Sequence, residues 1–376
     1  MRTWARARAY PLTRMAVSEY FSPDYRTARV RFREAAQQCG AQLSEYLLPA
    51  HQGPHGESLA VDVAQLGAAE PDRALLVISG THGVEGLCGA GCQLGLLQDR
   101  LGEVLPGSTR LLLVHALNPY GFAWLRRVTE EGIDLNRNFV DFAQPLPSSA
   151  AYEALHEWLV PQDWDGPARA AADAALGGYL QKYGARALQE AVQAGQYSRP
   201  TGLFYGGAGP SWSARALERI LEESLPRSVR TLAVLDLHTG LGPPGYGEPI
   251  LTRCGPADVE RAQRWYGPEV KDLSGGKSVS AQVLGSLADG IARLRPSVQL
   301  TFLALEFGTR PMLEVLTALR GDHCLHAAGG GESALRRAVR QQMRAAFFSD
   351  SPAWQAAVYG RTADFFYRAC RGLGAA

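Results

Sequence analysis

Residues 73–86, RALLVISGTHGVEG, show the pattern that decides the fold: an aliphatic run followed by a turn that contains Gly, Thr, His and Glu. Continuous rather than alternating apolarity is typical of a strand that is buried on both faces of a mostly parallel sheet. Similar runs occur at residues 109–119, 229–240, 249–254 and 299–308. We predict a strand in each of these segments.

Segments with helical character lie between these runs, at residues 27–39, 89–100, 212–223, 311–320 and 332–348. Alternating strands and helices indicate an α/β layered domain. Residues 142–209 interrupt the alternation with an Ala-rich stretch, and we predict a helix over 168–194. Because no Pro/Ser/Gly-rich linker flanks this stretch, we interpret it as an insertion in a single domain spanning residues 15–376.

The composition excludes several classes of protein. A hydrophobic fraction of 46% with 20% charged residues is ordinary for a globular chain of 376 residues. The net charge of +1 gives no basic excess of the kind that binds nucleic acid. The longest apolar runs are far shorter than the roughly 20 residues of a membrane helix. We therefore expect no nucleic-acid or membrane partner, while the oligomeric state stays open.

Cysteine usage and the N-terminus both favour a cytoplasmic location. The six cysteines are scattered over a long chain, which indicates free thiols in a reducing compartment rather than a disulfide framework. Residues 1–14 are basic and acid-free, but no apolar segment of a secretory signal follows them. A transit peptide is one interpretation; an N-terminal extension ahead of a true start at Met15 fits at least as well.

Polar residues cluster where the predicted strands end, and in open α/β sheets sites form at the C-terminal ends of strands. His82 and Glu85 follow the first run, His238 ends the third and Glu306 ends the last. The second run leads to Arg127, Asn136 and Arg137. We expect these side chains to share one concavity.

This set of residues suits a catalytic metal. Two histidines and a carboxylate, His82, Glu85 and His238, leave a fourth position for water, as in catalytic zinc sites. Zinc lowers the pKa of such a water to about 7. Glu306 is then the candidate general base, which takes a proton from the attacking water and returns it to the leaving amine. We predict one Zn²⁺ per chain, although other divalent ions accept the same ligands.

The arginines and their neighbours suit the substrate. Arg127 is the candidate for stabilising the oxyanion on the attacked carbonyl. Asn136 and Arg137 are candidates for binding a substrate carboxylate, which a guanidinium pairs in bidentate geometry. Asp236 is compatible with orienting His238 and equally with a structural hydrogen bond. The role of Glu248 is equally open.

Longer stretches around these residues resemble the zinc carboxypeptidases of the M14 clan, and most closely the DUF2817 branch of bacterial proteins. The resemblance covers nearly the whole chain from about Met15. It is carried by YFSPDYRTAR at 20–29, SGTHGVEG at 79–86, DLNRNF at 134–139, GQY–RP–GLFYGG at 195–207, DLHTGLGP–GYGE at 236–248 and LEFGT at 305–309.

The resemblance implies a three-layer α/β/α sandwich around a mixed, mostly parallel eight-stranded sheet. It implies a zinc-dependent hydrolase that cleaves an amide beside a free carboxylate of a peptide or small amide. His82, Glu85 and His238 match the metal ligands, Glu306 the base, and Asn136 and Arg137 the carboxylate clamp. Arg127 matches the oxyanion arginine, with Arg126 as the alternative.

Two departures from the digestive carboxypeptidases keep other functions open. The segment between Glu85 and His238 is longer than in those enzymes. Residues 267–305 contain no tyrosine, whereas in those enzymes a tyrosine in this region covers a bound peptide. Tyr246 is the candidate substitute. The same ligand set serves deacylases of small N-acylated amino acids, of the aspartoacylase and succinylglutamate desuccinylase type. A non-catalytic scaffold that binds a carboxylate is a further alternative.

Overall fold

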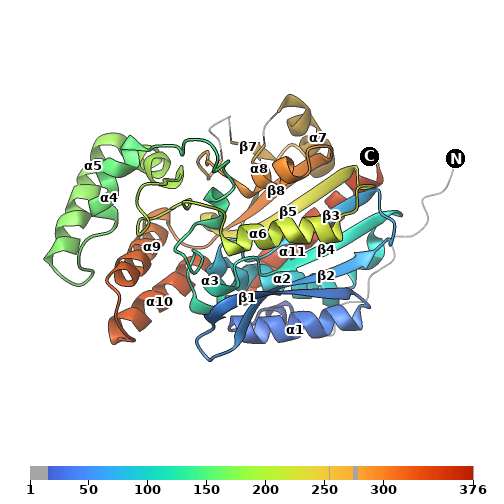
Figure 1. Cartoon of the computed structure of the whole chain (residues 1–376), viewed down its shortest axis with the longest axis horizontal. Coiled ribbons are helices and arrows are strands. Elements are labelled where there is room, and N and C mark those ends of the chain that lie inside the picture. Colours follow the sequence, from blue (N-terminus) through green and yellow to red (C-terminus); the bar gives the residue numbers. More distant parts are fainter. Residues whose placement is uncertain (1–15, 254, 274–277, 376) are drawn as a thin grey trace.

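The computed structural model describes residues 16–253, 255–273 and 278–375. The predicted extension at residues 1–14 lies outside this range. Eight strands form one mixed sheet in the order β1-β2-β4-β3-β5-β8-β6-β7 (Figure 1). The strands are β1 Gln42–Gln52, β2 Ser58–Gly67, β3 Arg73–Ile78, β4 Thr109–His115, β5 Thr231–Pro244, β6 Gly247–Leu251, β7 Lys271–Asp272 and β8 Gln299–Gly308.

The centre of the sheet is parallel and its flanks are largely antiparallel. Strand β4 pairs with β3, β3 with β5 and β5 with β8, all in parallel. Strands β1 and β2 run antiparallel to each other, as do β2 and β4, and β6 and β8. The mixed eight-stranded sheet is thus confirmed, and the five predicted strands correspond to β3, β4, β5, β6 and β8.

Helices cover both faces of the sheet and complete the three layers (Figure 1). One face packs against α1 (Tyr25–Gln38), α2 (Gly86–Gln98), α7 (Pro256–Tyr266) and α11 (Pro352–Gly374). The other face packs against α6 (Trp212–Ser224) and α8 (Leu287–Leu294). Alternate residues of one strand point into the two layers: Leu75 and Val77 of β3 belong to the first core, Leu76 and Ile78 to the second. This explains the unbroken apolar runs of the sequence.

The predicted insertion contains α4 (Ala150–Leu159) and α5 (Pro167–Gln193), and α5 agrees with the helix predicted over 168–194. Together with α9 (Met312–Ala327) and α10 (Ala334–Phe347), these helices lie at one end of the molecule (Figure 1). A third apolar cluster joins them, with Tyr152 and Leu188 packed among Leu319 and Met343. The insertion therefore has its own small core against α9 and α10.

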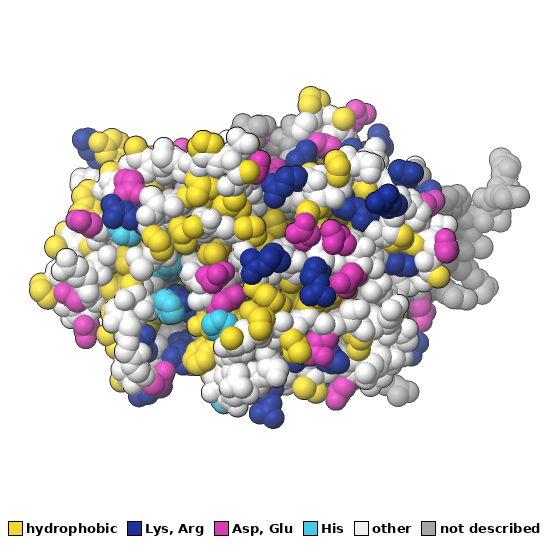
Figure 2. Space-filling view, in the orientation of Figure 1, with side chains coloured by type: hydrophobic (Ala, Val, Ile, Leu, Met, Phe, Trp, Pro, Cys, Tyr) yellow, Lys and Arg dark blue, Asp and Glu magenta, His cyan; other side chains and the backbone are white. Residues whose placement is uncertain are grey.

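Short elements connect this framework: α3 (Pro119–Trp124) and the 3-10 turns η1 (Val17–Tyr20), η2 (Gly83–Glu85), η3 (Leu101–Val104) and η4 (Leu135–Arg137). None of the helices in the described ranges has the length and apolarity that a membrane span requires. Positive and negative side chains are interspersed on the face drawn in Figure 2, in keeping with the net charge of +1.

Candidate metal centre and active site

The register of the parallel strands brings distant residues to one place. Ile78 of β3 pairs with Asp236 of β5, and two residues further along β5, His238 pairs with Glu306 of β8. The turn η2, which carries Glu85 and directly follows His82, begins shortly after β3 ends. The site therefore lies at the carboxyl ends of three adjacent strands, where open α/β sheets place their sites.

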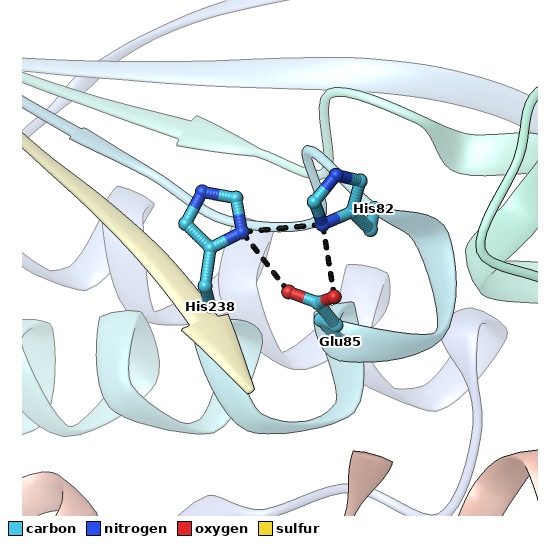
Figure 3. Close-up of side chains that lie close together, drawn as sticks. All are labelled: His82, Glu85 and His238. Carbon is cyan, nitrogen blue, oxygen red and sulfur yellow. Dashed lines mark hydrogen bonds and ion pairs between the residues drawn. The ribbon is translucent and has the colours of Figure 1, made fainter. Parts of the chain in front are cut away.

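His82, Glu85 and His238 converge closely (Figure 3). Nδ1 of His82 lies 2.9 Å from Oε1 of Glu85, and Nδ1 of His238 lies 3.1 Å from Oε2 of the same carboxylate. The two Nδ1 atoms are 3.2 Å apart. One ligand atom from each residue falls within 4.8 Å of the others, and all three side chains are buried. Two imidazole nitrogens and one carboxylate form a donor set that fits zinc.

Backbone packing fixes the turn that carries His82 and Glu85. The Gly83 N–H donates to the carbonyl of Arg127, and the Val84 N–H to that of Arg126. A Cβ at Gly83 would lie 2.1 Å from the backbone carbon of Gly121. Only glycine fits between these two segments, so the close contact holds both candidate ligands in place.

Two buried carboxylates lie against the far nitrogens of the histidines. Oδ2 of Asp236 is 2.7 Å from Nε2 of His238, and Oδ1 of Asp236 accepts a hydrogen bond from Thr81 Oγ1 at 2.7 Å. Oδ1 of Asp134 is 3.2 Å from Nε2 of His82. Such partners orient a ligating imidazole and leave its other nitrogen for the metal.

Asp236 was one of the residues whose role the sequence left open, and the structure places it against His238. The contact of Asp134 was not predicted. Its only signal in the sequence is its place at the start of DLNRNF, directly ahead of the predicted clamp residues.

Burial and neighbouring charges shift the pKa values of Glu85 and Glu306 in opposite directions. Burial raises the pKa of Glu85, but the charges and hydrogen bonds of His82 and His238 outweigh it and hold that pKa well below its ordinary value. Burial, helped by the charge of Glu85, raises the pKa of Glu306 to about 7. The Glu306 carboxylate accepts a hydrogen bond from the Leu241 N–H at 3.0 Å. A carboxyl with a pKa near neutrality suits a general base.

Arg127, and not Arg126, lies in the site. Its Nε donates to Asp134 at 2.9 Å and its Nη1 to Glu85 at 3.1 Å, while Nη2 is 2.7 Å from Nε2 of His82. Arg126 instead donates from Nε to Asp322, at 3.0 and 3.1 Å from its two oxygens. Arg127 is thus the arginine beside the candidate ligands.

Arg137 is held by the inserted helix. Its Nε and Nη2 both donate to the carbonyl of Gln193, at 3.0 and 2.5 Å, and its Nη1 donates to the carbonyl of Asn136 at 2.9 Å. A guanidinium has five N–H groups, so one N–H remains on each terminal nitrogen. These two suit a bidentate carboxylate. The side-chain oxygen of Asn136 accepts from the Leu287 N–H at 2.8 Å, which leaves its amide N–H₂ for a ligand.

One pocket of about 70 Å³ collects most of these side chains: His82, Arg127, Asn136, Arg137, His238 and Glu306. The remaining wall is largely apolar and includes Ile250, Leu273 and Ala304 from the sheet side and Gln193 and Phe204 from the insertion. Tyr246 is not among the lining residues; it is 42% exposed, and the guanidinium of Arg361 lies 5.8 Å from its ring centre. Phe204 and Gln193 were not predicted to line the pocket: Phe204 lies in the GLFYGG stretch that carries the resemblance, but neither residue type by itself indicates this chemistry.

Comparison with known proteins identifies the family. A family model described as a protein of unknown function, DUF2817, matches residues 21–361. The chain belongs to the DUF2817 family. This confirms the resemblance that the sequence motifs indicate. Among curated proteins, none matches this DUF2817 chain.

Several solved structures resemble this DUF2817 protein at low identity. Thrombin activatable fibrinolysis inhibitor is 12% identical, with 92% of this chain and 76% of that chain covered and a TM-score of 0.44. Carboxypeptidase A from Helicoverpa armigera is also 12% identical, with coverages of 92% and 74% and a TM-score of 0.44. An aspartoacylase family protein from Mesorhizobium loti is 18% identical, with coverages of 71% and 61% and a TM-score of 0.36. The matched region is thus less than two thirds of the length of the aspartoacylase family protein.

Proposed function

We propose that this protein is a zinc-dependent hydrolase of carboxypeptidase type, which cleaves an amide bond beside a free carboxylate. The observation that carries the proposal is the convergence of His82, Glu85 and His238 in the pocket that also holds Glu306 and two arginines. His82, Glu85 and His238 would hold the ion. A bound zinc ion supplies Lewis-acid activation of water and of the scissile carbonyl.

Side chains of the pocket carry out proton transfer, charge stabilisation and substrate binding. Glu306 takes a proton from the attacking water and delivers it to the leaving amine, which its raised pKa of about 7 favours. Arg127 stabilises the negative charge that develops on the carbonyl oxygen. Arg137, with its two remaining N–H groups, binds the neighbouring carboxylate together with the Asn136 amide. The acyl and amine products then leave the pocket.

A second candidate is a deacylase of small N-acylated amino acids. The observation that favours it is the small pocket, with a wall formed by Gln193 and Phe204 of the insertion. An acyl amino acid carries the same amide and carboxylate as a peptide terminus but needs less room. Comparing turnover of N-blocked dipeptides with that of N-acetyl amino acids separates the two candidates, since only a carboxypeptidase gains from the longer substrate.

The first test is metal content by mass spectrometry on protein purified without added metal. We expect about one zinc per chain, as a three-ligand site holds one ion, and its loss in His238→Ala. The matched control is His323→Ala, which removes a buried histidine that does not line the pocket. Absence of metal, or equal metal in His238→Ala and wild type, would contradict the proposal and favour the non-catalytic scaffold.

A further inference from the structure

We propose that Phe204, contributed by the inserted segment, is a positioning residue that fixes the guanidinium groups of both Arg127 and Arg137. The inference rests on the proposed function, because it concerns the arginines of that same pocket. Through Phe204, the insertion would contribute to substrate binding by holding the arginines of the pocket in position.

The first observation is that the ring of Phe204 lies close to two guanidinium groups. The guanidinium carbon of Arg127 lies 5.1 Å from the ring centre of Phe204, and that of Arg137 lies 5.4 Å from it. Both distances are within the roughly 6 Å at which a cation is attracted by the face of an aromatic ring. Phe204 is only 5% exposed, so water weakens these contacts little. The ring therefore offsets part of the repulsion between two neighbouring positive charges.

The second observation is the backbone conformation of Phe204. Its φ is +54°, in the left-handed region that residues with large side chains rarely adopt. Strain of this kind persists where the surroundings hold it, and it clusters at functional sites. Here the Gln196 N–H donates to the Phe204 carbonyl at 3.1 Å, and the Gln196 side chain donates to the Leu203 carbonyl at 3.2 Å.

The third observation is that the loop is attached to the segment that carries the clamp. The Asp134 N–H donates to the carbonyl of Tyr205 at 2.8 Å, and the Tyr197 hydroxyl donates to the carbonyl of Arg137 at 2.7 Å. The same Asp134 accepts from Arg127. The ring of Phe204 and the two arginines are thus parts of one hydrogen-bonded unit.

Packing alone is the competing explanation, because Phe204 also belongs to the apolar cluster with Val315 and Leu319. The two explanations differ for Phe204→Leu. Leucine keeps an apolar side chain in the cluster but has no aromatic face, whereas tyrosine keeps the ring. If Phe204 only packs, Phe204→Leu should bind a carboxylate as well as wild type. If it positions the arginines, Phe204→Leu should bind more weakly and Phe204→Tyr should bind like wild type.

The experiment measures binding of phenylacetate, a carboxylate with an apolar group, to the full chain by calorimetry, for wild type, Phe204→Leu and Phe204→Tyr. We expect the leucine variant to bind about tenfold more weakly, within the range that a desolvated cation–aromatic contact provides, and the tyrosine variant to bind within about twofold of wild type. The same leucine change in an Arg137→Ala background should have no further effect on phenylacetate binding, because the guanidinium that binds the carboxylate is gone and Arg127 does not contact it. Thermal unfolding of each variant shows that the fold is intact.

The outcomes separate the two proposals. If Arg137→Ala weakens phenylacetate binding while Phe204→Leu matches wild type, the role of Phe204 is wrong and the clamp stands. Equal loss from the leucine change in both backgrounds overturns the positioning role in favour of packing. If Arg137→Ala binds as well as wild type, or if wild type shows no saturable binding, the clamp and the role of Phe204 are both overturned. Should Phe204→Leu fail to fold, Phe204→Met gives the same comparison.

Discussion

Removing the carboxylate of Asp236 tests the candidate metal centre without changing a candidate ligand. Asp236 is fully buried and touches the centre through His238, whose Nε2 lies 2.7 Å from Oδ2. In Asp236→Asn, the amide oxygen can still accept from His238, and Thr81 can rotate its hydroxyl to accept from the amide. Asp236→Ala removes both contacts. The asparagine variant therefore tests the effect of the negative charge, and the alanine variant also tests the effect of the hydrogen bond to His238.

The expected magnitudes follow from these contacts. Loss of a carboxylate behind a ligating histidine typically lowers metal affinity by about 10–100-fold, which is about 1.4–2.8 kcal/mol. We expect Asp236→Asn near the lower value, because His238 keeps its hydrogen bond and loses only the negative charge behind it. We expect Asp236→Ala near the upper value, because the imidazole then has no partner on that side.

The assay is zinc affinity by competition with a chromogenic chelator, on protein stripped of metal by dialysis. The matched control is Asp62→Asn. Asp62 is also fully buried, but its carboxylate pairs with Arg29 and Arg33, away from the candidate ligands. This control should lower stability and leave zinc affinity unchanged.

Two results would refute the role of Asp236 in orienting His238. Wild-type zinc affinity in Asp236→Ala would show that His238 needs no orienting carboxylate or is no ligand. An equal fall in zinc affinity in Asp62→Asn and Asp236→Ala would show that any loss of a buried carboxylate acts through the fold as a whole.

Three further predictions concern turnover, backbone packing and pH. Glu306→Gln should retain zinc and lose about 10²–10⁴-fold in kcat, since a general base contributes that much; a variant with near-wild-type turnover would remove Glu306 from the mechanism. Gly83→Ala should lose zinc and unfold at a lower temperature, because the added Cβ would lie 2.1 Å from the backbone of Gly121, whereas the control Gly107→Ala meets nothing within 4 Å. Equal melting temperatures for these two variants would contradict the packing argument. Burial, with a smaller effect of Arg29, lowers the pKa of His115 to about 3 from 6.5, so the folded state favours the neutral ring. Its contribution to stability is complete above pH 6.5 and falls by about 1.4 kcal/mol per pH unit between pH 6.5 and about 3. His115→Leu should therefore lose less stability than wild type between pH 7 and 4 in denaturant titrations, and equal losses would refute this assignment.

The residues of the site could be placed from the sequence because the parallel strands are easy to recognise. Runs such as residues 74–78 are continuous and apolar, since both faces of β3 are buried. Once the ends of β3, β5 and β8 are located, the parallel register brings His82, His238 and Glu306 together. The chemistry of the strand ends therefore follows from local patterns.

Strands β1, β2 and β7 and the part of the pocket wall that the insertion forms could not be found in this way. Strand β1 is mostly exposed and contains Pro49, so its sequence lacks the signal of a central strand. The contact between Phe204 and Arg137 joins residues of separate loops, and nothing near either residue indicates the other. The hydrogen bond from Arg137 to Gln193 uses a backbone carbonyl, which any residue at that position offers.

The pocket takes side chains from the ends of the central strands and from the insertion between β4 and β5. The pairing of β3, β5 and β8 determines the positions of His82, His238 and Glu306. A shift in the register of these strands would move the three side chains apart. Residues 142–209 lie between β4 and β5 and take no part in that pairing. A segment of different length or composition at this point would change the contacts of Gln193 and Phe204 with the arginines of the pocket, while the strand ends keep their spacing. The candidate metal ligands and Glu306 can therefore keep their positions while the surroundings of the two arginines change.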